Sequence, residues 1–87
     1  MASAAEKLLQ RMRQSKQGWG QYDLEVLYTG FQFKYRDKGG HRVYWHPRHR
    51  ELIATVARHD TLAIGYIQYA IKMIDRLLEL ENAEDAE

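Results

Sequence analysis

Apolar residues recur along this chain with two different periods, and the period changes twice. Before residue 31 they are spaced three or four residues apart, which is the spacing of one helical face. From residue 31 to residue 57 apolar and polar residues alternate in short runs, as they do in half-buried strands. The helical spacing returns from about residue 63. The pattern predicts helices, then strands, then a last helix.

Two short helices are predicted before the strands. Ser3-Ala4-Ala5-Glu6 has the form of a capping box, in which the two polar side chains satisfy free amides at a helix start. Gln17-Gly18 is expected to end this helix. A second helix is predicted from Gly20 to Gly30, and Gly30 suits the left-handed conformation in which many helices end.

Three strands follow, joined by short turns that predict an antiparallel meander. The strands are predicted at residues 31–36, 41–46 and 52–57, and the turns at 37–40 and 47–50. Successive side chains of a strand point to opposite faces. His41 and His46 are therefore expected to point to opposite sides of the sheet.

A last helix is predicted over residues 63–80, with two adjacent apolar stripes that either both pack on the rest of the fold or leave one for a partner. The order α-α-β-β-β-α predicts an α+β two-layer sandwich, in which a three-stranded antiparallel sheet carries the helices on one face. We expect a single domain over residues 1–81, with 1–17 as an N-terminal helical extension. Residues 82–87 are expected to form a frayed acidic tail.

Composition excludes several classes of protein. The chain has 87 residues and no cysteine, which fits one domain and excludes disulfides, thiolate metal sites and a cysteine nucleophile. Its glycines form no phosphate-binding motif such as G-x-G-x-x-G. No apolar run approaches the roughly 20 residues that a membrane-spanning helix needs, and no signal-peptide pattern is present. We therefore expect a cytoplasmic protein that does not enter the membrane.

The formal net charge is +1, but the charges are unevenly distributed. Residues 31–59 hold seven lysines and arginines, two acids and all four histidines. Residues 75–87 hold six acids and one arginine. A basic middle suits an anionic partner such as a nucleic acid, whereas the acidic end is expected to be solvated surface.

The first predicted turn is the most distinctive region chemically. Lys38-Gly39-Gly40-His41 places an imidazole directly after two glycines, which let a phosphate approach the main chain closely. Arg48 and Arg50, in the second turn, either extend a phosphate-binding surface or lie in a solvated loop. The cations around the first turn that could each neutralise a phosphate are Lys34, Arg36, Lys38 and Arg42.

These groups would permit RNA cleavage. A base removes the proton of the ribose 2′-hydroxyl, the oxygen attacks the adjacent phosphorus, and cations stabilise the charge that develops. His41 is the candidate proton-transfer group, and Tyr44 or a water molecule is the candidate for the second. The aromatic residues that could stack on unpaired bases are Tyr35, Tyr44 and Trp45.

Other uses of the histidines stay open. His46 and His49 are separated by two residues, and His41 and His59 could join them in a zinc site. We expect no metal site, because His41 and His46 should point to opposite faces. A histidine beside a turn can also have a purely structural role.

The order of these motifs resembles the HicA toxins, which are small messenger-RNA-cleaving partners of HicB antitoxins. The likeness covers roughly residues 18–78. The matching pieces are Gly30-Phe31, Lys38-Gly39-Gly40-His41, a strand ending in His46-Pro47, a strand followed by Arg58-His59, and a last helix with Tyr66-Ile67. The family has Gly-Ser-His where this chain has Gly39-Gly40-His41, so a serine hydroxyl is missing there.

The resemblance implies a fold like that of double-stranded-RNA-binding domains and a metal-independent ribonuclease without a cofactor. It gives the catalytic role to His41 and to no other histidine. The RNA contacts expected around it are Arg36, Lys38, Gly39, Gly40 and Arg42. The implied partners are messenger RNA and a HicB-like antitoxin. A non-catalytic RNA-binding module and a toxin-like protein-interaction domain remain as alternatives.

Overall fold

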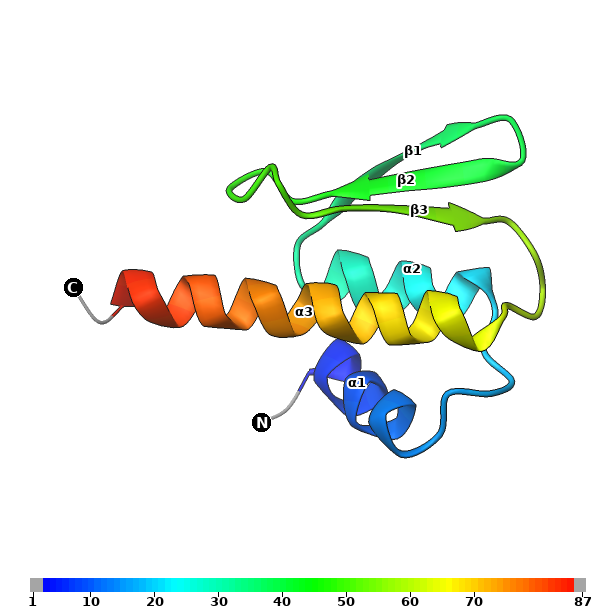
Figure 1. Cartoon of the computed structure of the whole chain (residues 1–87), viewed down its shortest axis with the longest axis horizontal. Helices are drawn as coiled ribbons and strands as arrows, with labels where there is room; N and C mark the ends of the chain where they lie inside the picture. The colour runs from blue at the N-terminus through cyan, green and yellow to red at the C-terminus, as the bar shows by residue number, and fades with distance from the viewer. Residues whose placement is uncertain (1–2, 86–87) are drawn as a thin grey trace.

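The chain forms three helices and three strands in the order that its pattern predicts (Figure 1). The structure is a computed structural model, and it describes residues 3–85. The elements are α1 (Ala4–Gln14), α2 (Gln21–Gly30), β1 (Lys34–Lys38), β2 (His41–Trp45), β3 (Ile53–Ala57) and α3 (Ile64–Asp85). The predicted α+β class and its order of elements are therefore confirmed.

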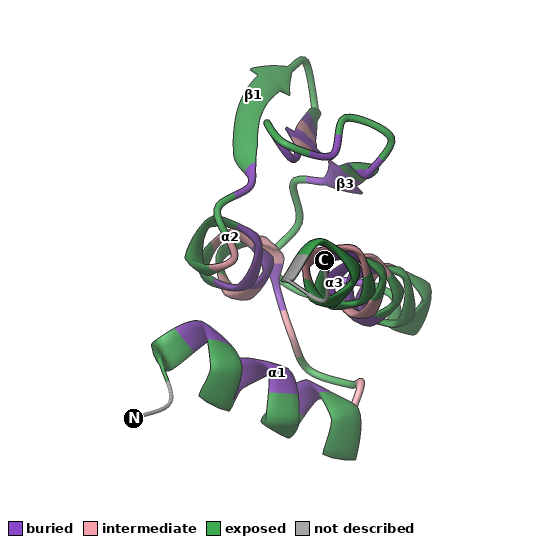
Figure 2. Ribbon diagram, turned by 90° about the vertical axis from the view of Figure 1, so that its left-hand side faces the viewer, coloured by how far each residue is buried: buried purple, intermediate pink, exposed green. Residues whose placement is uncertain are grey.

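The helices all lie on one side of the sheet. The strand order is β1-β2-β3, and both neighbouring pairs are antiparallel. α2 and α3 lie side by side under the sheet, and α1 packs beneath them as a third layer (Figures 1 and 2). None of the described helices covers the opposite face of the sheet (Figure 2). One face of the sheet thus belongs to the core, and the other is left to solvent.

α1 begins as the capping box predicts. The Ser3 hydroxyl accepts a hydrogen bond from the Glu6 amide at 3.1 Å, and the Ser3 amide donates to the Glu6 carboxylate at 3.1 Å. The buried face of the helix is formed by Ala5, Leu8, Leu9 and Met12. Burial of one large aliphatic side chain contributes about 1.5–3 kcal/mol, so packing on α2 and α3 is what holds this short helix in place.

Gly30 allows two helices to pack closely, and it does not form the predicted left-handed turn. It is the last residue of α2, and the left-handed conformation falls instead on Gln32, whose φ is 73°. A Cβ atom at position 30 would lie 2.2 Å from the Ala5 Cβ. α1 and α2 can therefore meet at this point only because residue 30 has no side chain.

An apolar core fills the space between the sheet and the helices. Tyr28 of α2 stacks on Tyr44 of β2, with ring centroids 4.4 Å apart, and so joins the two layers. Both apolar stripes predicted on α3 contribute to this core. Their buried members are Ile67, Ile71 and Ile74 from one stripe and Ala70 and Leu77 from the other. The apolar surface of α3 is therefore largely used within the fold.

The first hairpin has a tighter turn than predicted, and β1 covers Lys34–Lys38 instead of residues 31–36, because a turn at residues 31–32 follows α2. Asp37 and Lys38 belong to β1, because the strand pairing continues to Lys38 opposite His41. Only Gly39 and Gly40 remain for the turn, and Gly39 has a φ of 61°. Glycine is the residue that adopts this conformation without strain, so the paired glycines explain how His41 can directly follow the turn.

α3 continues to Asp85, beyond its predicted end at Leu80. Residues 82–85, predicted as part of a frayed tail, are therefore helical, while residues 86–87 lie outside the described residues. No glycine or proline follows Leu80, so nothing in the sequence ends the helix there. Among the described helices, none combines the length and apolar character that crossing a membrane requires.

Candidate functional site

The strand register gathers the predicted site residues on the open face of the sheet. Directly opposed residues on neighbouring strands point to the same face. Across β1 and β2 the opposed pairs are Lys34–Trp45, Arg36–Val43 and Lys38–His41. Across β2 and β3 they are Trp45–Ile53, Val43–Thr55 and His41–Ala57. We call the surface formed by Lys34, Arg36, Lys38, His41, Val43, Trp45, Ile53 and Thr55 the outer face.

His41 is exposed at the start of β2, immediately after the hairpin turn. Its opposed neighbour is Lys38, and Cβ atoms of such pairs lie about 4.5–5.5 Å apart. The imidazole and the ammonium group can therefore reach the same bound group. A Cβ atom at Gly39 or Gly40 would meet nothing within 4 Å, so space is open around the turn that leads to His41.

Two shallow hollows lie on the outer face. The first, about 410 Å³ in volume, is lined by Lys38, His41, Val43 and Thr55. The second, about 260 Å³ in volume, is lined by Arg36, Val43, Trp45 and Ile53. Val43 borders both hollows. One hollow thus combines an imidazole with an ammonium group, and its neighbour combines an indole with a guanidinium group.

The outer-face cations of β1 are available to an external anion. Lys34, Arg36 and Lys38 are exposed, and none forms a salt bridge with a side chain that the structure describes. Alternate residues of a strand are about 6.7 Å apart, so the three charges form an evenly spaced row. A row of this kind suits a chain of regularly spaced phosphates.

Arg42 lies on the inner face of the sheet, which removes it from the expected RNA contacts. Its side chain is 8% exposed. Its Nε donates to Asp37 Oδ1 at 2.7 Å, and its Nη1 donates to Glu25 of α2. The hydrogen bond with Asp37 is the main cause that raises the pKa of Arg42 and lowers the pKa of Asp37. Arg42 therefore ties the first hairpin to α2 and is directed away from the outer face.

Only Trp45, of the aromatic residues predicted to stack on bases, lies on the outer face. Tyr44 is buried against Tyr28. Tyr35 lies on the inner face, where its ring centroid is 4.0 Å from the Arg42 guanidinium. Burial is the main cause that raises the pKa of Tyr44. The Tyr44 hydroxyl is therefore no longer a candidate for the second proton transfer on the outer face.

None of the other histidines lines either hollow of the outer face. His46 and His49 are buried with ring centroids 5.2 Å apart, and His59 is exposed in the loop before α3. Burial is the main cause that lowers the pKa of His46. The predicted opposite orientation of His41 and His46 is confirmed. Within the part of the chain that the structure describes, no group of three or more metal-ligating side chains is placed to hold an ion.

The second turn faces α3. Arg48 forms a salt bridge with Glu81, and His49 Nε2 lies 3.7 Å from Glu84 Oε1. Acidic residues that were predicted to be solvated surface thus contact the turn. Arg48 and Glu81 are 33 positions apart, so sequence spacing gives no sign of their contact. Arg48 does not extend the outer face.

Thr55 and Ile53 are members of the outer face that sequence reasoning does not identify. Both come from β3, which carries no charged residue, so its sequence does not predict a binding strand. The signal that could identify them is the register. Once His41 is opposed to Ala57, the alternation places Thr55 beside Val43 and Ile53 beside Trp45.

The outer face can bind an extended anion, offer an unpaired base a flat indole, and present one imidazole to a phosphate. No family model matches the chain, and neither a curated protein nor a solved structure matches it. The likeness to the HicA toxins therefore rests on the residues quoted for it.

Proposed function

We propose that the protein is an endoribonuclease that cleaves messenger RNA on the outer face, with His41 as the proton-transfer group. One observation carries the proposal: His41 stands exposed beside Lys38, at the end of a row of cations that have no acidic partner among residues 3–85. The resemblance to the HicA toxins independently points to His41.

The proposed reaction is attack by a ribose 2′-hydroxyl on the neighbouring phosphorus. The neutral His41 imidazole accepts the hydroxyl proton, and the 2′-oxygen forms a bond to phosphorus. The bond from phosphorus to the 5′-oxygen breaks, and that oxygen takes a proton from water or from the Lys38 ammonium group. The products are a 2′,3′-cyclic phosphate and a 5′-hydroxyl. The proposed step uses only side chains and water, so it requires no cofactor.

Lys38 is placed to stabilise the transition state. It shares the first hollow with His41, so a phosphate bound there would lie beside both groups. Negative charge on the phosphate oxygens increases as the 2′-oxygen attacks, and a nearby cation favours that increase. Arg36 and Lys34 continue the row and would hold the next phosphates of the same strand.

Trp45 favours a single-stranded substrate. It lies four residues along β2 from His41 on the same face, which corresponds to about 13 Å. Stacking on an indole requires a base that is not already paired and stacked in a duplex. An RNA strand that crosses the outer face could therefore place one base in the second hollow while the scissile phosphate lies in the first.

The test is cleavage of a labelled single-stranded RNA in buffer that contains a metal chelator. We expect wild-type protein to produce fragments with 2′,3′-cyclic phosphate ends. His41→Ala should cleave at least about 100-fold more slowly, because general acid–base catalysis contributes roughly 10²–10⁴-fold. His59→Ala is the matched control, since this histidine is also exposed but lies outside both hollows, and it should cleave at the wild-type rate.

Equal cleavage by wild type and folded His41→Ala would overturn the proposed mechanism. Circular dichroism and the thermal midpoint check that the variant is folded. Because His41 is exposed, its truncation should leave the midpoint nearly unchanged.

The proposed biological role follows from the same reaction. A toxin of a toxin–antitoxin pair would act on messenger RNA in the cytoplasm and would be held inactive by a HicB-like protein. Induced expression of wild type should then arrest growth and shorten message half-lives, while His41→Ala should do neither. Growth arrest by both proteins would separate toxicity from RNA cleavage and contradict this role.

A non-catalytic RNA-binding module is the second candidate, and one observation favours it. The first hollow contains a single imidazole, and the expected partner hydroxyl of Tyr44 is buried on the other face. A salt-sensitive shift of RNA in a native gel, without new fragments, would support this candidate over the nuclease.

A further inference from the structure

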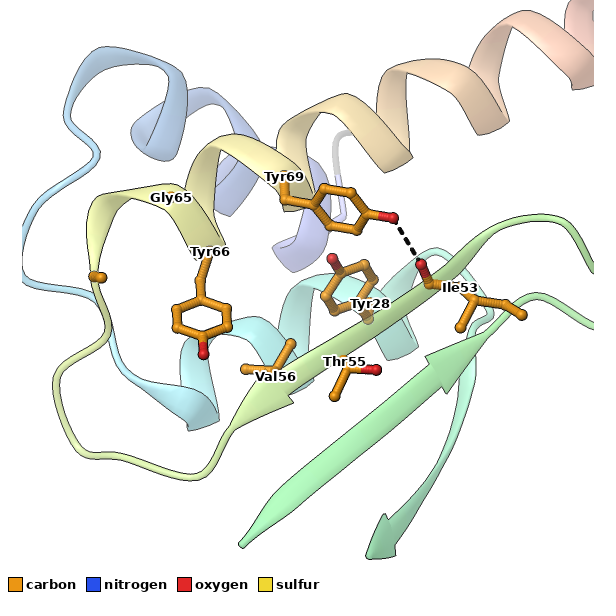
Figure 3. Close-up of a pocket in the computed structure, with 8 residues that line it drawn as sticks. Tyr28, Ile53, Thr55, Val56, Gly65, Tyr66 and Tyr69 are labelled. Carbon is orange, nitrogen blue, oxygen red and sulfur yellow. Dashed lines mark hydrogen bonds between the residues drawn. The ribbon is translucent and has the colours of Figure 1, made fainter.

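A groove runs between β3 and the first turns of α3 (Figure 3). Its volume is about 460 Å³, within the range of roughly 300–1,000 Å³ that ligand sites have. The residues that line it are Tyr28, Ile53, Thr55, Val56, Ala63, Gly65, Tyr66 and Tyr69. None of them is charged. The proposed nuclease uses only Ile53 and Thr55 of these residues, at the border of its two hollows, and leaves the rest of the groove unused.

β3 is an edge strand, and its pairing shows which backbone groups are used. The Arg58 amide donates to the Gly40 carbonyl, and the His46 amide donates to the Leu52 carbonyl. Even-numbered residues of this segment therefore direct their amide and carbonyl groups toward β2. Neighbouring residues of a strand direct these groups to opposite sides. Odd-numbered residues of β3 thus direct theirs away from the sheet.

The contact of Tyr69 with β3 supports this assignment. Its hydroxyl donates to the Ile53 carbonyl at 2.9 Å, so the carbonyl of an odd-numbered residue does point away from β2 (Figure 3). No comparable bond to the Thr55 amide or carbonyl is formed within the described residues. Thr55 therefore offers one donor and one acceptor at the border of the groove.

Tyr28 supplies a second unsatisfied group. Its side chain is 0% exposed, yet its hydroxyl has no hydrogen-bond partner among the described atoms. The ring stands between β3 and α3, and the hydroxyl points toward α3 (Figure 3). A buried hydroxyl without a partner is uncommon and destabilising. It indicates a place for a polar group that a ligand would bring.

The groove ends at the N-terminus of α3. α3 has 22 residues and no acidic residue in its first turn, and the amides at a helix N-terminus carry partial positive charge. Ala63 and Gly65 line the groove at this end, and neither side chain is large enough to cover these amides. A carboxylate is the complementary group.

We propose that this groove binds an extended peptide, which pairs with Thr55 as a fourth strand and places a carboxylate at the first turn of α3. The unpaired main-chain groups select a peptide, because a strand supplies a donor and an acceptor at the required spacing. Addition of a strand to an exposed sheet edge is a common mode of peptide recognition. One side chain of the peptide enters between Tyr66 and Tyr69 and reaches the Tyr28 hydroxyl.

The two edges of the sheet differ in the way this proposal requires. All five residues of β1 are exposed, and most are charged, which discourages pairing with another strand. β3 has no charged residue. The edge that borders the groove is therefore the one that a peptide can join without meeting a row of charges.

The probe is a displayed library of random linear peptides of about twelve residues, selected on the full chain. We expect enriched sequences with alternating apolar residues and an aspartate or glutamate at one end. Binding of a synthetic copy should slow hydrogen exchange of the Thr55 amide by at least about tenfold, because strand pairing would protect it. Selected peptides that leave this amide unprotected would overturn the proposal.

Gly65→Leu is the blocking variant. A Cβ atom at Gly65 would meet nothing within 4 Å, so the larger side chain can enter the groove without a clash inside the protein. It should weaken peptide binding by at least about tenfold, while the thermal midpoint stays the same or rises, because leucine favours a helix over glycine. Gln68→Leu adds the same side chain to the same helix outside the groove and should bind as wild type does.

Three further outcomes would overturn the proposal. The first is the absence of any enriched sequence, and the second is equal affinity of an enriched peptide for wild type and Gly65→Leu. The third is a stable dimer in sedimentation experiments in which the Thr55 amide is protected without peptide, since a second copy would then occupy this edge.

Discussion

The inner and outer faces of β2 use neighbouring residues for opposite purposes. On the inner face, Arg42 is bonded to Asp37 and Glu25, and Tyr44 is stacked on a buried ring. On the outer face, His41 is exposed beside cations that have no acidic partner among the described residues. Polar groups that hold a fold together are paired, so the unpaired polar groups of the outer face are available to a partner. Substitutions that remove side chains of the inner face should therefore reduce stability, and substitutions that remove side chains of the outer face should reduce RNA binding or cleavage.

The largest expected effect on stability is that of Tyr44→Ala, and its comparison is Trp45→Ala, the next residue on the opposite face of β2. Tyr44→Ala should lower the free energy of unfolding by about 3–5 kcal/mol, as truncation of a buried aromatic residue usually does. Trp45→Ala should cost much less stability, because Trp45 is only half-buried. It should instead weaken binding of single-stranded RNA by about 1–3 kcal/mol, the range for loss of one stacking ring.

Urea denaturation and fluorescence anisotropy with a labelled RNA measure the two effects. The comparison fails if Trp45→Ala binds RNA as tightly as wild type. It also fails if Tyr44→Ala is no less stable than Trp45→Ala.

A second pair of variants compares Arg36 on the outer face with Arg42 on the inner face. Arg36→Ala should reduce the dependence of RNA affinity on salt. The magnitude of the slope of log K against log[salt] should decrease by about 0.7 for one lost phosphate contact. Its thermal midpoint should stay near wild type, because Arg36 is exposed and forms no described salt bridge. Arg42→Met should leave that slope unchanged but lower the midpoint by several degrees, since Asp37 and Glu25 lose their partner. The opposite assignment of the two effects would contradict the placement of Arg42.

A smaller effect concerns the pH dependence of stability that His46 produces. Burial lowers the pKa of His46 below its ordinary value of 6.5. As the pH falls below about 6.5, the unfolded chain takes up a proton that the folded chain does not, so stability should decrease in acid and not in base. His46→Gln cannot titrate, and its thermal midpoint should change less than that of wild type between pH 7 and pH 5. Identical profiles for wild type and His46→Gln would contradict this account.

The smallest expected effect is an increase in stability. Tyr28→Phe removes a buried hydroxyl that has no partner among the atoms the structure describes, and it keeps the ring that stacks on Tyr44. The free energy of unfolding should rise by up to about 1 kcal/mol in the free protein. A loss of stability in urea denaturation would show that the hydroxyl has a partner after all.

The order of the elements could be predicted because each segment keeps one hydrophobic period over enough residues to distinguish a helix from a strand. Ser3 and Glu6 mark the start of α1, and the paired glycines mark the hairpin. The role of Gly30 could not be predicted, because it depends on contact with Ala5 in another helix. The acidity of the last residues predicts an earlier end for α3 than the structure has, although no glycine or proline occurs there.

The candidate site was only partly accessible from the sequence. Alternation already separates His41 from Arg42 within one strand. Whether Lys38 and Arg36 share the face of His41 depends on the register between strands, which charge counting ignores. Proximity in sequence predicts that Arg42 acts with the other cations, whereas its pairing with Glu25 depends on the tertiary contact between β2 and α2.

The most direct test of the central claim uses a strand of deoxyribonucleotides that contains one ribonucleotide. If His41 acts on a 2′-hydroxyl, wild-type protein should cut once, on the 3′ side of the ribonucleotide, and leave a 2′,3′-cyclic phosphate, whereas His41→Ala should leave the strand intact over the same time. Cleavage between deoxyribonucleotides, or an intact strand with the wild-type protein, would contradict the account.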